Sequence, residues 1–288
     1  MNSQVKSSKS FLCGLIGAGL QKSRTPPMHE QEGQAQGLRY VYRTIDIEQL
    51  GVGVEALPEL LRAAKLMGFN GLNITHPFKQ LVLPLLDELS DDARALNAVN
   101  TVVIKDGRMT GHNTDWWGFA EGFKRGLPDV ARNCAVQLGA GGAGAAVAHA
   151  AMQLGIQKLY LRDVDPAKAQ LVADSLNARF GAGRVVVCTD LEAAMAEADG
   201  LIHATPIGMA NYPGLPLPEA LLNARHWVAE IVYFPLETEL LRVAKAKGCR
   251  VLNGGGMAVF QAVGAFQLFT GSEPDAERMK AHFASLGA

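Results

Sequence analysis

The sequence has no excess of charge of either sign. Its 288 residues include 27 Lys and Arg against 28 Asp and Glu, which gives a formal net charge of −1. This balance offers no electrostatic argument for nucleic acid or an anionic membrane as a partner. No apolar run is long enough to span a bilayer, and the polar first ten residues lack the apolar segment of a signal peptide. We therefore expect a cytoplasmic protein without nucleic-acid or membrane partners.

Cysteine and clustered metal-binding side chains are also scarce. The four cysteines form no C-x-x-C pair, and three of them lie in or beside apolar, strand-like segments; they are Cys13, Cys134, Cys188 and Cys249. We expect buried, free thiols in a reducing compartment. No group of His, Cys, Asp and Glu residues has the spacing of metal ligands, so the sequence predicts no metal site.

Apolar residues make up 48% of the chain and follow a rhythm of short strands and helices. The length fits one large or two ordinary domains. In the second half, apolar runs alternate with helical stretches, which predicts a parallel sheet with helices on both faces. We expect strands at 11–16, 39–45, 69–75, 98–104, 109–112, 135–138, 158–162, 185–188, 200–204, 227–232 and 250–252. We expect helices at 26–36, 54–67, 91–96, 116–126, 257–270 and 275–286, among others.

A glycine-rich turn joins the expected strand at 135–138 to an alanine-rich helix. Its spacing, Gly139-x-Gly141-x-x-Gly144, is the dinucleotide-binding fingerprint. The first glycine permits the tight turn, the second allows a pyrophosphate to approach the backbone, and the third lets the helix pack closely on the strand. Asp163 follows the next strand, at the distance where such a unit binds the adenosine ribose. This context favours a nucleotide site over a plain tight turn.

Polar residues stand where expected strands of the first half end, the position where open α/β sheets bind ligands. Ser23 and Thr25 precede a helix, and spacing alone favours helix capping, at least for Thr25. Lys79 opens a helix, where its charge opposes the helix dipole, so it is either a solvated surface lysine or a residue with an anionic partner or a function. Asp115 is a candidate for helix capping, for catalysis, or for both.

Together these segments resemble the motifs of the shikimate/quinate dehydrogenase family, in the family's order and over nearly the whole chain. The matches are 23–29 with S-x-[ST]-P-x-M-H, 73–79 with N-[VI]-T-x-P-[FY]-K, 97–101 with A-V-N-T, 111–115 with G-x-N-T-D, 139–145 with the nucleotide loop, 233–238 with Y-x-P-x-x-T and 254–261 with G-x-x-M-x-x-x-Q. The resemblance implies an α/β enzyme that interconverts the C3 alcohol and ketone of shikimate- or quinate-type ring carboxylates.

The resemblance also implies roles for individual residues. Lys79 and Asp115 would be the catalytic pair: a neutral Lys79 would accept the hydroxyl proton in oxidation, and its ammonium would donate one in reduction. A nearby carboxylate favours the charged lysine, so Asp115 would mainly orient it. The substrate would be bound by Ser23, Thr25, Asn73, Thr75, Asn100, Tyr233 and Gln261. The cofactor would be bound by Gly139, Ala140, Gly141, Gly142, Ala143, Asp163, Val164, Thr205, Val232, Gly254 and Met257.

The segment after the second nucleotide strand departs from the NADP-type pattern of the family, N-R-T-x-x-R. Here Asp163 and Val164 stand where a 2′-phosphate would need cations, so we predict NAD as the cofactor. Arg162 should point to the opposite face because it precedes Asp163 in the strand, and Lys168 should reach only solvent. Thr25 resembles the branch that also accepts quinate. Trp116 either narrows the site or points into the core.

We expect two α/β domains: a substrate-binding domain (1–115), a Rossmann-type NAD domain (116–254) and C-terminal helices (255–288) that return to the first domain. The enzyme would act in aromatic amino-acid biosynthesis or in quinate catabolism, as a monomer or homodimer. Two alternatives stay open: a dehydrogenase for an amino-substituted shikimate analogue, and a non-catalytic nicotinamide-binding sensor. Retention of both Lys79 and Asp115 argues against the sensor.

Overall fold

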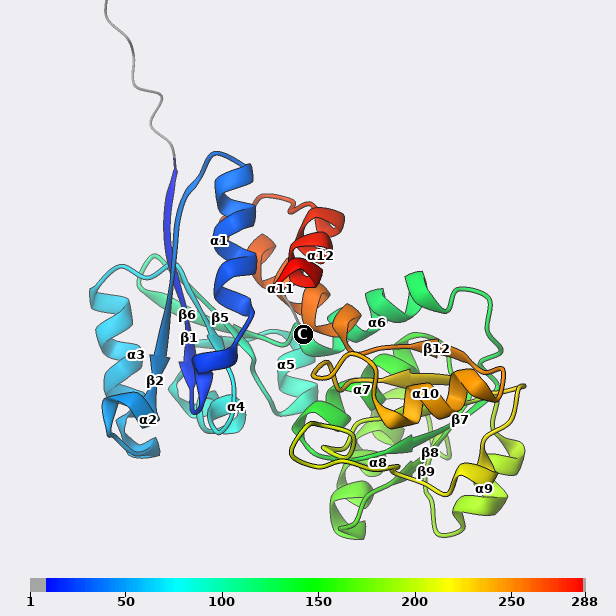
Figure 1. Ribbon diagram of the computed structural model, residues 1–288. Helices are drawn as coiled ribbons and strands as arrows, with labels where there is room; N and C mark the ends of the chain where they lie inside the picture. Colours follow the sequence, from blue (N-terminus) through cyan, green and yellow to red (C-terminus); the bar gives the residue numbers. More distant parts are fainter. Residues whose placement is uncertain (1–8, 287–288) are drawn as a thin grey trace, which may run out of the picture. The chain divides into compact units, whose positions relative to one another are not determined.

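The computed structural model describes residues 9–286, which divide into two compact units (Figure 1). Unit 1 comprises the chain up to Thr114 and the segment from Ala262 on, and unit 2 comprises Asp115–Gln261. The second boundary between the units, between Gln261 and Ala262, lies within one helix, α11 (Gly255–Thr270). Both units are mixed α/β structures, as the sequence predicts.

Unit 1 contains a six-stranded sheet in the order β2-β1-β3-β5-β6-β4. Its strands are β1 (Ser10–Gly17), β2 (Arg39–Asp46), β3 (Gly71–Ile74), β4 (Glu88–Leu89), β5 (Thr101–Lys105) and β6 (Arg108–His112). The first three are mutually parallel, whereas β5 runs antiparallel to both β3 and β6. Asp106 and Gly107 both have positive φ in the β5–β6 turn, the conformation that the Asp-Gly pair predicts.

The helices of unit 1 cover both faces of this sheet. Along β1, Cys13 and Leu15 belong to a core with aromatic residues of β2 and α11, while Ile16 belongs to the core under α3. This alternation is the period of two expected of a strand buried on both faces. The elements are α1 (Thr25–Ala35), α2 (Ile47–Leu50), α3 (Leu57–Leu66), α4 (Phe78–Leu81), α5 (Asp91–Leu96), α12 (Ala276–Ser285) and the 3₁₀ turns η1 (Leu20–Lys22), η2 (Val54–Ala56) and η3 (Leu83–Leu85).

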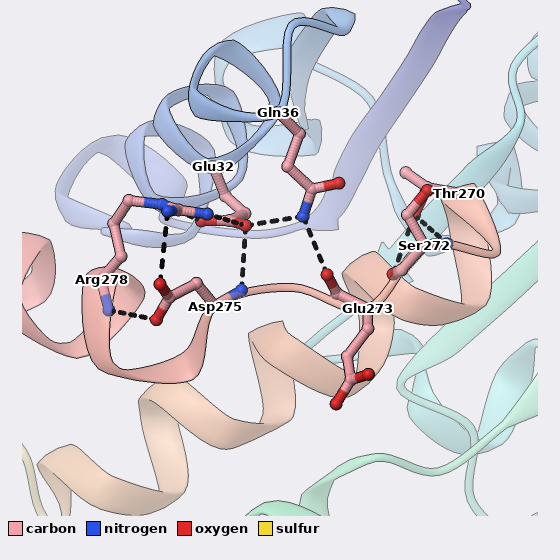
Figure 2. Close-up of polar contacts among 7 residues, drawn as sticks. All are labelled: Glu32, Gln36, Thr270, Ser272, Glu273, Asp275 and Arg278. Atoms are coloured by element: carbon pink, nitrogen blue, oxygen red, sulfur yellow. Dashed lines mark hydrogen bonds and ion pairs between the residues drawn. The ribbon is translucent and has the colours of Figure 1, made fainter.

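The C-terminal segment from Ala262 on belongs to unit 1. Phe266 of α11 stacks on Tyr40 of β2, with ring centroids 5.2 Å apart. Helix α12 contacts α1 through the buried carboxylate of Glu32, which accepts hydrogen bonds from Arg278, Gln36 and the Asp275 N–H (Figure 2). The polar C-terminal helix is therefore an integral part of the first unit.

Unit 2 contains a six-stranded, wholly parallel sheet in the order β12-β11-β10-β7-β8-β9. The strands are β7 (Cys134–Leu138), β8 (Lys158–Arg162), β9 (Val185–Val187), β10 (Gly200–His203), β11 (Trp227–Glu230) and β12 (Arg250–Leu252). The strand order reverses between β7 and β10, which is the switch point at which doubly wound sheets bind nucleotides. This is the Rossmann arrangement that the sequence predicts.

Two apolar cores lie on the two faces of this sheet. Ala135 of β7 contributes to the core with α6, α7 and α8, and Val136 contributes to the core with α9 and α10. The helices are α6 (Asp115–Gly126), α7 (Gly142–Gln153), α8 (Pro166–Phe180), α9 (Leu191–Glu197), α10 (Glu239–Ala246) and the first part of α11, with a 3₁₀ turn η4 (Glu219–Leu221). All four cysteines are free and buried, as expected.

Differences from the predicted elements concern helix and strand ends and a few elements that the sequence does not predict. The helix expected at 54–67 begins as the 3₁₀ turn η2 and becomes α-helical only at Leu57, with Pro58 in the first turn, where its missing N–H costs nothing. Strand β3 is shorter than 69–75, and α10 falls outside the predicted ranges. Among residues 9–286, no helix combines the length and the apolar character needed to cross a membrane.

Candidate functional site

A buried network of amides and hydroxyls lies at the carboxyl end of β3 in unit 1. Asn73 donates from Nδ2 to Thr101 Oγ1 at 3.0 Å and to the Asn100 carbonyl at 3.3 Å, and its Oδ1 accepts from the Tyr42 hydroxyl at 2.7 Å. Both amide protons of Asn73 are therefore used inside the protein, and its remaining capacity is as an acceptor at Oδ1.

Asn100 continues this network toward the end of β6. Its Oδ1 accepts from the Thr114 N–H at 2.7 Å, and its Nδ2 donates to Thr114 Oγ1 at 3.0 Å. The Thr101 hydroxyl also lies 3.1 Å from Asn100 Oδ1. Asn73 and Asn100 are predicted from the sequence, whereas Tyr42, Thr101 and Thr114, which orient them, are not.

The loop between β1 and α1 places its two hydroxyls differently from expectation. The Thr25 N–H donates to Ser23 Oγ at 3.3 Å, so Ser23 makes the cap-like hydrogen bond at this helix start. Thr25 is the first helical residue, and the cap position is held by Arg24 without a side-chain hydrogen bond. The expectation that Thr25 caps the helix is therefore wrong, because the helix begins one residue earlier than the two prolines suggest.

Contacts with the β3–α4 loop and with helix α12 fix the position of this loop. The Ala18 N–H donates to the His76 carbonyl at 3.0 Å, and a side chain at Gly17 would clash with the Thr75 methyl group. Arg24 lies over the Phe283 ring of α12, with its guanidinium carbon 4.9 Å from the ring centroid. The start of this loop is thus held against the segment that carries Thr75, and its end is held against α12.

Lys79 lies in α4, a helix of one turn. Its neighbour Phe78 is fully buried in the unit 1 core, and the Val99 N–H donates to the Lys79 carbonyl at 2.8 Å. The backbone that carries this lysine is therefore well anchored, while its side chain is half-buried. A single turn has little macrodipole, so the position of Lys79 in this helix is less unfavourable than the sequence suggests.

Asp115 and Trp116 open α6 in unit 2. Asp115 is buried and is the first helical residue, directly after Thr114. Trp116 packs against the apolar core of unit 2, and its ring meets the ring of His149 edge-on with centroids 5.4 Å apart. Of the two alternatives for Trp116, the structure therefore supports packing into the core.

The glycine loop of unit 2 has the geometry that the fingerprint requires. Gly139 has φ +102°, and a side chain there would clash with the Ala204 carbonyl. A side chain at Gly144 would clash with the Gly139 carbonyl, so this glycine permits the close approach of α7 to the strand. Positions 141 and 142 face open space, and no side chain caps the N-terminus of α7.

Gln137, which is not among the predicted site residues, stabilises this loop through two hydrogen bonds. It is fully buried, and its Nε2 donates to the carbonyls of Gly139 and Gly144 at 2.9 and 2.7 Å. A polar residue inside an otherwise apolar strand is the sequence signal that points to it.

Asp163 lies just beyond β8 and lines a pocket of about 440 Å³ at the carboxyl ends of β7, β8, β9 and β10. Its Oδ2 accepts from the Ala140 N–H at 2.7 Å, and its Oδ1 accepts from the Asp165 N–H at 2.9 Å. Val164, fully exposed, lines the same pocket. The carboxylate thus joins the glycine loop to the end of the neighbouring strand.

Arg162 also lines this pocket, contrary to the prediction that it points to the opposite face. Asp163 stands after the last residue of β8, so strand alternation no longer relates the two side chains. Arg162 lies beside Cys188: burial raises the pKa of the Cys188 thiol, and Arg162 opposes that rise. Lys168 is mostly exposed and lies 4.0 Å from the Asp165 carboxylate.

The remaining predicted residues of unit 2 lie on other loops and on α11. Thr205 lines the pocket of Asp163, and Val232 is buried after β11. Tyr233 is 45% exposed. Gly254 precedes α11, Met257 packs on the unit 2 core, and the Gln261 backbone lies against Gly118 of α6. Within residues 9–286, no group of three or more His, Cys, Asp or Glu residues converges as metal ligands would.

The fold and this loop define unit 2 as a dinucleotide-binding unit of the Rossmann class. Residues 15–102 match the family model of the shikimate dehydrogenase substrate binding domain, and residues 254–282 match that of the shikimate 5′-dehydrogenase C-terminal domain. These matches, with full-length relatives that are 58% and 53% identical, show that the chain belongs to the shikimate/quinate dehydrogenase family.

Similar proteins cover nearly the whole chain. A shikimate dehydrogenase (NADP(+)) of Streptomyces avermitilis is 58% identical over 96% of each chain. A quinate/shikimate dehydrogenase (NAD(+)) of Corynebacterium efficiens is 53% identical over 96% of this chain and 99% of the relative. Among solved structures, quinate dehydrogenase from Corynebacterium glutamicum in complex with NAD has a TM-score of 0.92 and 52% identity, over 96% of this chain and 100% of that one.

Proposed function

We propose that this protein is an NAD-dependent dehydrogenase that interconverts the C3 alcohol and ketone of shikimate and quinate. The observation that carries the proposal is the position of Asp163, which presents a carboxylate to the same pocket as the glycine loop, beside an exposed Val164. The membership of the family, shown by full-length relatives, supplies the reaction class.

The residues of unit 2 fit NAD. The N–H groups at the start of α7 have no side-chain acceptor, and the space above positions 141 and 142 is open to a pyrophosphate. Each oxygen of Asp163 accepts one backbone N–H and keeps a lone pair for a ribose hydroxyl. When bound, NAD supplies the hydride acceptor.

The relatives are named for both cofactors at similar identity, so the residues around the ribose decide between them. A 2′-phosphate beside Asp163 would place two anions together in a partly desolvated pocket, which is unfavourable. Val164 offers no compensating charge. The quinate dehydrogenase of similar fold is in complex with NAD, which supports the same choice here.

For the substrate, we propose unit 1 as the main binding domain. Ser23 and Thr25 would bind the ring carboxylate at the start of α1, and Thr75 and Asn100 would bind ring hydroxyls. Asn73 would contribute its Oδ1 as an acceptor, since its amide protons are engaged. We propose that Gln261 and Tyr233 complete the set.

We propose Lys79 as the general acid and base and Asp115 as its orienting partner. In oxidation, Lys79 Nζ takes the proton of the C3 hydroxyl; in reduction, the ammonium returns it to the alkoxide oxygen. The anchored backbone of α4 supports this role, because a proton donor must be held within hydrogen-bond reach of one oxygen. The protein would act as a cytoplasmic monomer or homodimer.

Absorbance at the NADH wavelength tests the proposal with purified protein. Shikimate, quinate and an amino-substituted shikimate are each offered with NAD and with NADP. We expect reduction of NAD with shikimate or quinate. Turnover confined to the amino analogue would favour that substrate class, and cofactor binding without turnover on any of the three would favour the sensor.

A further inference from the structure

Two fully buried ionisable side chains of unit 2 have no part in the function described so far. His203 ends β10 and Glu230 ends β11, and their exposed fractions are 0% and 1%. His203 Nδ1 lies 2.9 and 3.0 Å from the two oxygens of the Glu230 carboxylate. The two residues are paired in the parallel register of β10 and β11.

His203 connects this carboxylate to the nucleotide pocket. Its Nε2 lies 2.5 Å from the hydroxyl of Thr205, and Thr205 lines the pocket that also contains Asp163 and Val164. The Ile207 N–H donates to the same hydroxyl oxygen at 3.3 Å. Thr205 is thus the point where a buried chain of polar groups, Glu230–His203–Thr205, reaches the pocket.

The directions of these hydrogen bonds follow when Glu230 is ionised and His203 is neutral. An ionised Glu230 can only accept, so His203 Nδ1 must donate to it. The other nitrogen of a neutral imidazole then accepts, and the Thr205 hydroxyl donates to it. The Thr205 oxygen consequently presents its lone pairs outward, toward the Ile207 N–H and toward a donor on a bound ligand.

We propose that Glu230 and His203 are positioning residues that hold the Thr205 hydroxyl as an acceptor for NAD. This inference rests on the proposed function, since it assigns to NAD the pocket lined by Thr205 and Asp163. Such an oxygen would accept a hydrogen bond from a ribose hydroxyl or from an amino group of the cofactor. The substrate-binding residues of unit 1 take no part in this chain.

Glu230→Gln is the variant that tests the direction of the chain. A glutamine amide can donate to His203 Nδ1, which moves the imidazole proton to Nε2 and turns Thr205 from donor to acceptor toward His203. Glu230 also accepts from the Val232 N–H and from Thr238 Oγ1, and the carbonyl of glutamine can keep the first of these. The side-chain volume is nearly unchanged.

We expect Glu230→Gln and Thr205→Val each to raise the Kd for NAD about 5- to 10-fold, the usual size of one hydrogen bond. The Michaelis constant for shikimate should not change, and Thr205→Ser should restore NAD binding. Adding Glu230→Gln to Thr205→Val should cause no further loss, because the carboxylate acts only through the hydroxyl. Calorimetry with NAD and with ADP-ribose measures these values without turnover.

Thr238→Val is the matched control. It removes another hydrogen bond to Glu230 and the cap of α10, but it leaves His203 and Thr205 in place. It should lower the melting temperature and leave the Kd for NAD unchanged. The proposal would be overturned if Glu230→Gln weakened NAD binding equally in the wild type and in Thr205→Val. An unchanged Kd for NAD in Glu230→Gln would overturn it too. Normal NAD binding by a protein inactive on all ring carboxylates would instead contradict the proposed reaction.

Discussion

Arg278 of α12 binds the carboxylate of Glu32 of α1 in a bidentate ion pair. Nε donates to Oε2 and Nη2 donates to Oε1, both at 2.7 Å, and the Glu32 side chain is fully buried while Arg278 is 37% exposed (Figure 2). Glu32 and Arg278 are 246 positions apart in the chain. This pair fastens the last helix to the helix that follows the Ser23 loop.

Removal of the arginine should destabilise unit 1. Arg278→Ala leaves a buried carboxylate with only the Gln36 amide and the Asp275 N–H as donors. We expect a loss of about 3 kcal/mol in the free energy of unfolding, the lower end for a broken buried pair because Arg278 is partly exposed. Urea unfolding followed by circular dichroism measures it, with Lys280→Ala on the same helix as the control. An unchanged midpoint would contradict the role of the pair.

The ion pair of Glu32 and Arg278 should also make the free energy of unfolding depend on pH. Burial alone raises the pKa of Glu32, but hydrogen bonds from Arg278, the Asp275 N–H and Gln36 hold it below its usual value. An acid with a lowered pKa in the folded state stabilises the protein above the unfolded-state value and loses that effect as pH falls through the folded-state value. The stability gap between the wild type and Arg278→Ala should therefore be full where Glu32 is ionised in both folded proteins, and it should shrink as pH falls toward the lowered pKa that Glu32 has in the wild type.

His29 also makes the free energy of unfolding depend on pH at acid pH. This effect is the same in the wild type and in Arg278→Ala, so it cancels in their difference. Burial lowers the pKa of His29 to about 3, so protonation of the unfolded chain below its ordinary value of 6.5 reduces stability in both proteins alike. Unfolding midpoints measured from pH 7 to pH 3.5 should show the gap closing only at the acid end. A gap that is constant with pH would mean that Glu32 is not the group that Arg278 stabilises.

Loss of the proposed acid and base should affect turnover more than binding. We expect Lys79→Ala to lower kcat by roughly 10²- to 10⁴-fold, with the Kd for NAD nearly unchanged. Asp115→Asn should also lower kcat. Lys105→Ala, an exposed lysine of the β5–β6 hairpin, is the control and should keep full activity. Near-normal turnover of Lys79→Ala would refute the assignment.

Substitutions should separate the roles of the two hydroxyls of the β1–α1 loop, those of Ser23 and Thr25. Thr25→Val removes a hydroxyl that does not cap the helix, so it should raise the Michaelis constant for shikimate with little change in the melting temperature. Ser23→Ala also removes the acceptor of the Thr25 N–H, so it should change both quantities. If Thr25→Val leaves the Michaelis constants for shikimate and quinate unchanged, the loop has only a structural role.

Cofactor choice should follow the side chains at the ribose. We expect the unmodified protein to prefer NAD over NADP by a margin visible in a simple comparison of rates. Asp163→Ala with Val164→Arg should shift the preference toward NADP. Asp163→Ser with Val164→Arg is the gentler variant, because serine can still accept from the Asp165 N–H.

Arg162 provides the check on this prediction, since it lines the same pocket. Arg162→Ala in the otherwise unmodified protein should leave the rate with NAD nearly unchanged. Equal catalytic efficiency of the unmodified protein with NAD and NADP would contradict the preference. If Arg162→Ala then removed the activity with NADP alone, the guanidinium would be the group that receives the 2′-phosphate.

The sequence by itself determined the features that depend on neighbouring residues. The turn at Gly139, the close approach at Gly144 and the Asp106-Gly107 hairpin are local requirements of backbone geometry, and the structure has all three. The parallel sheet of unit 2 follows from the alternation of apolar runs and helices. The motif order was enough to place the chain in its family, because each motif is short and contiguous.

The tertiary structure decided what depends on residues far apart in the chain. Asn73 is oriented by Tyr42 and Thr101, and His203 meets Glu230 only because β10 and β11 lie side by side. Arg162 shares a pocket with Asp163 because the strand ends between them. Hydrogen-bond partners 27 to 246 positions apart leave no periodic trace in a single sequence, so packing alone selects them.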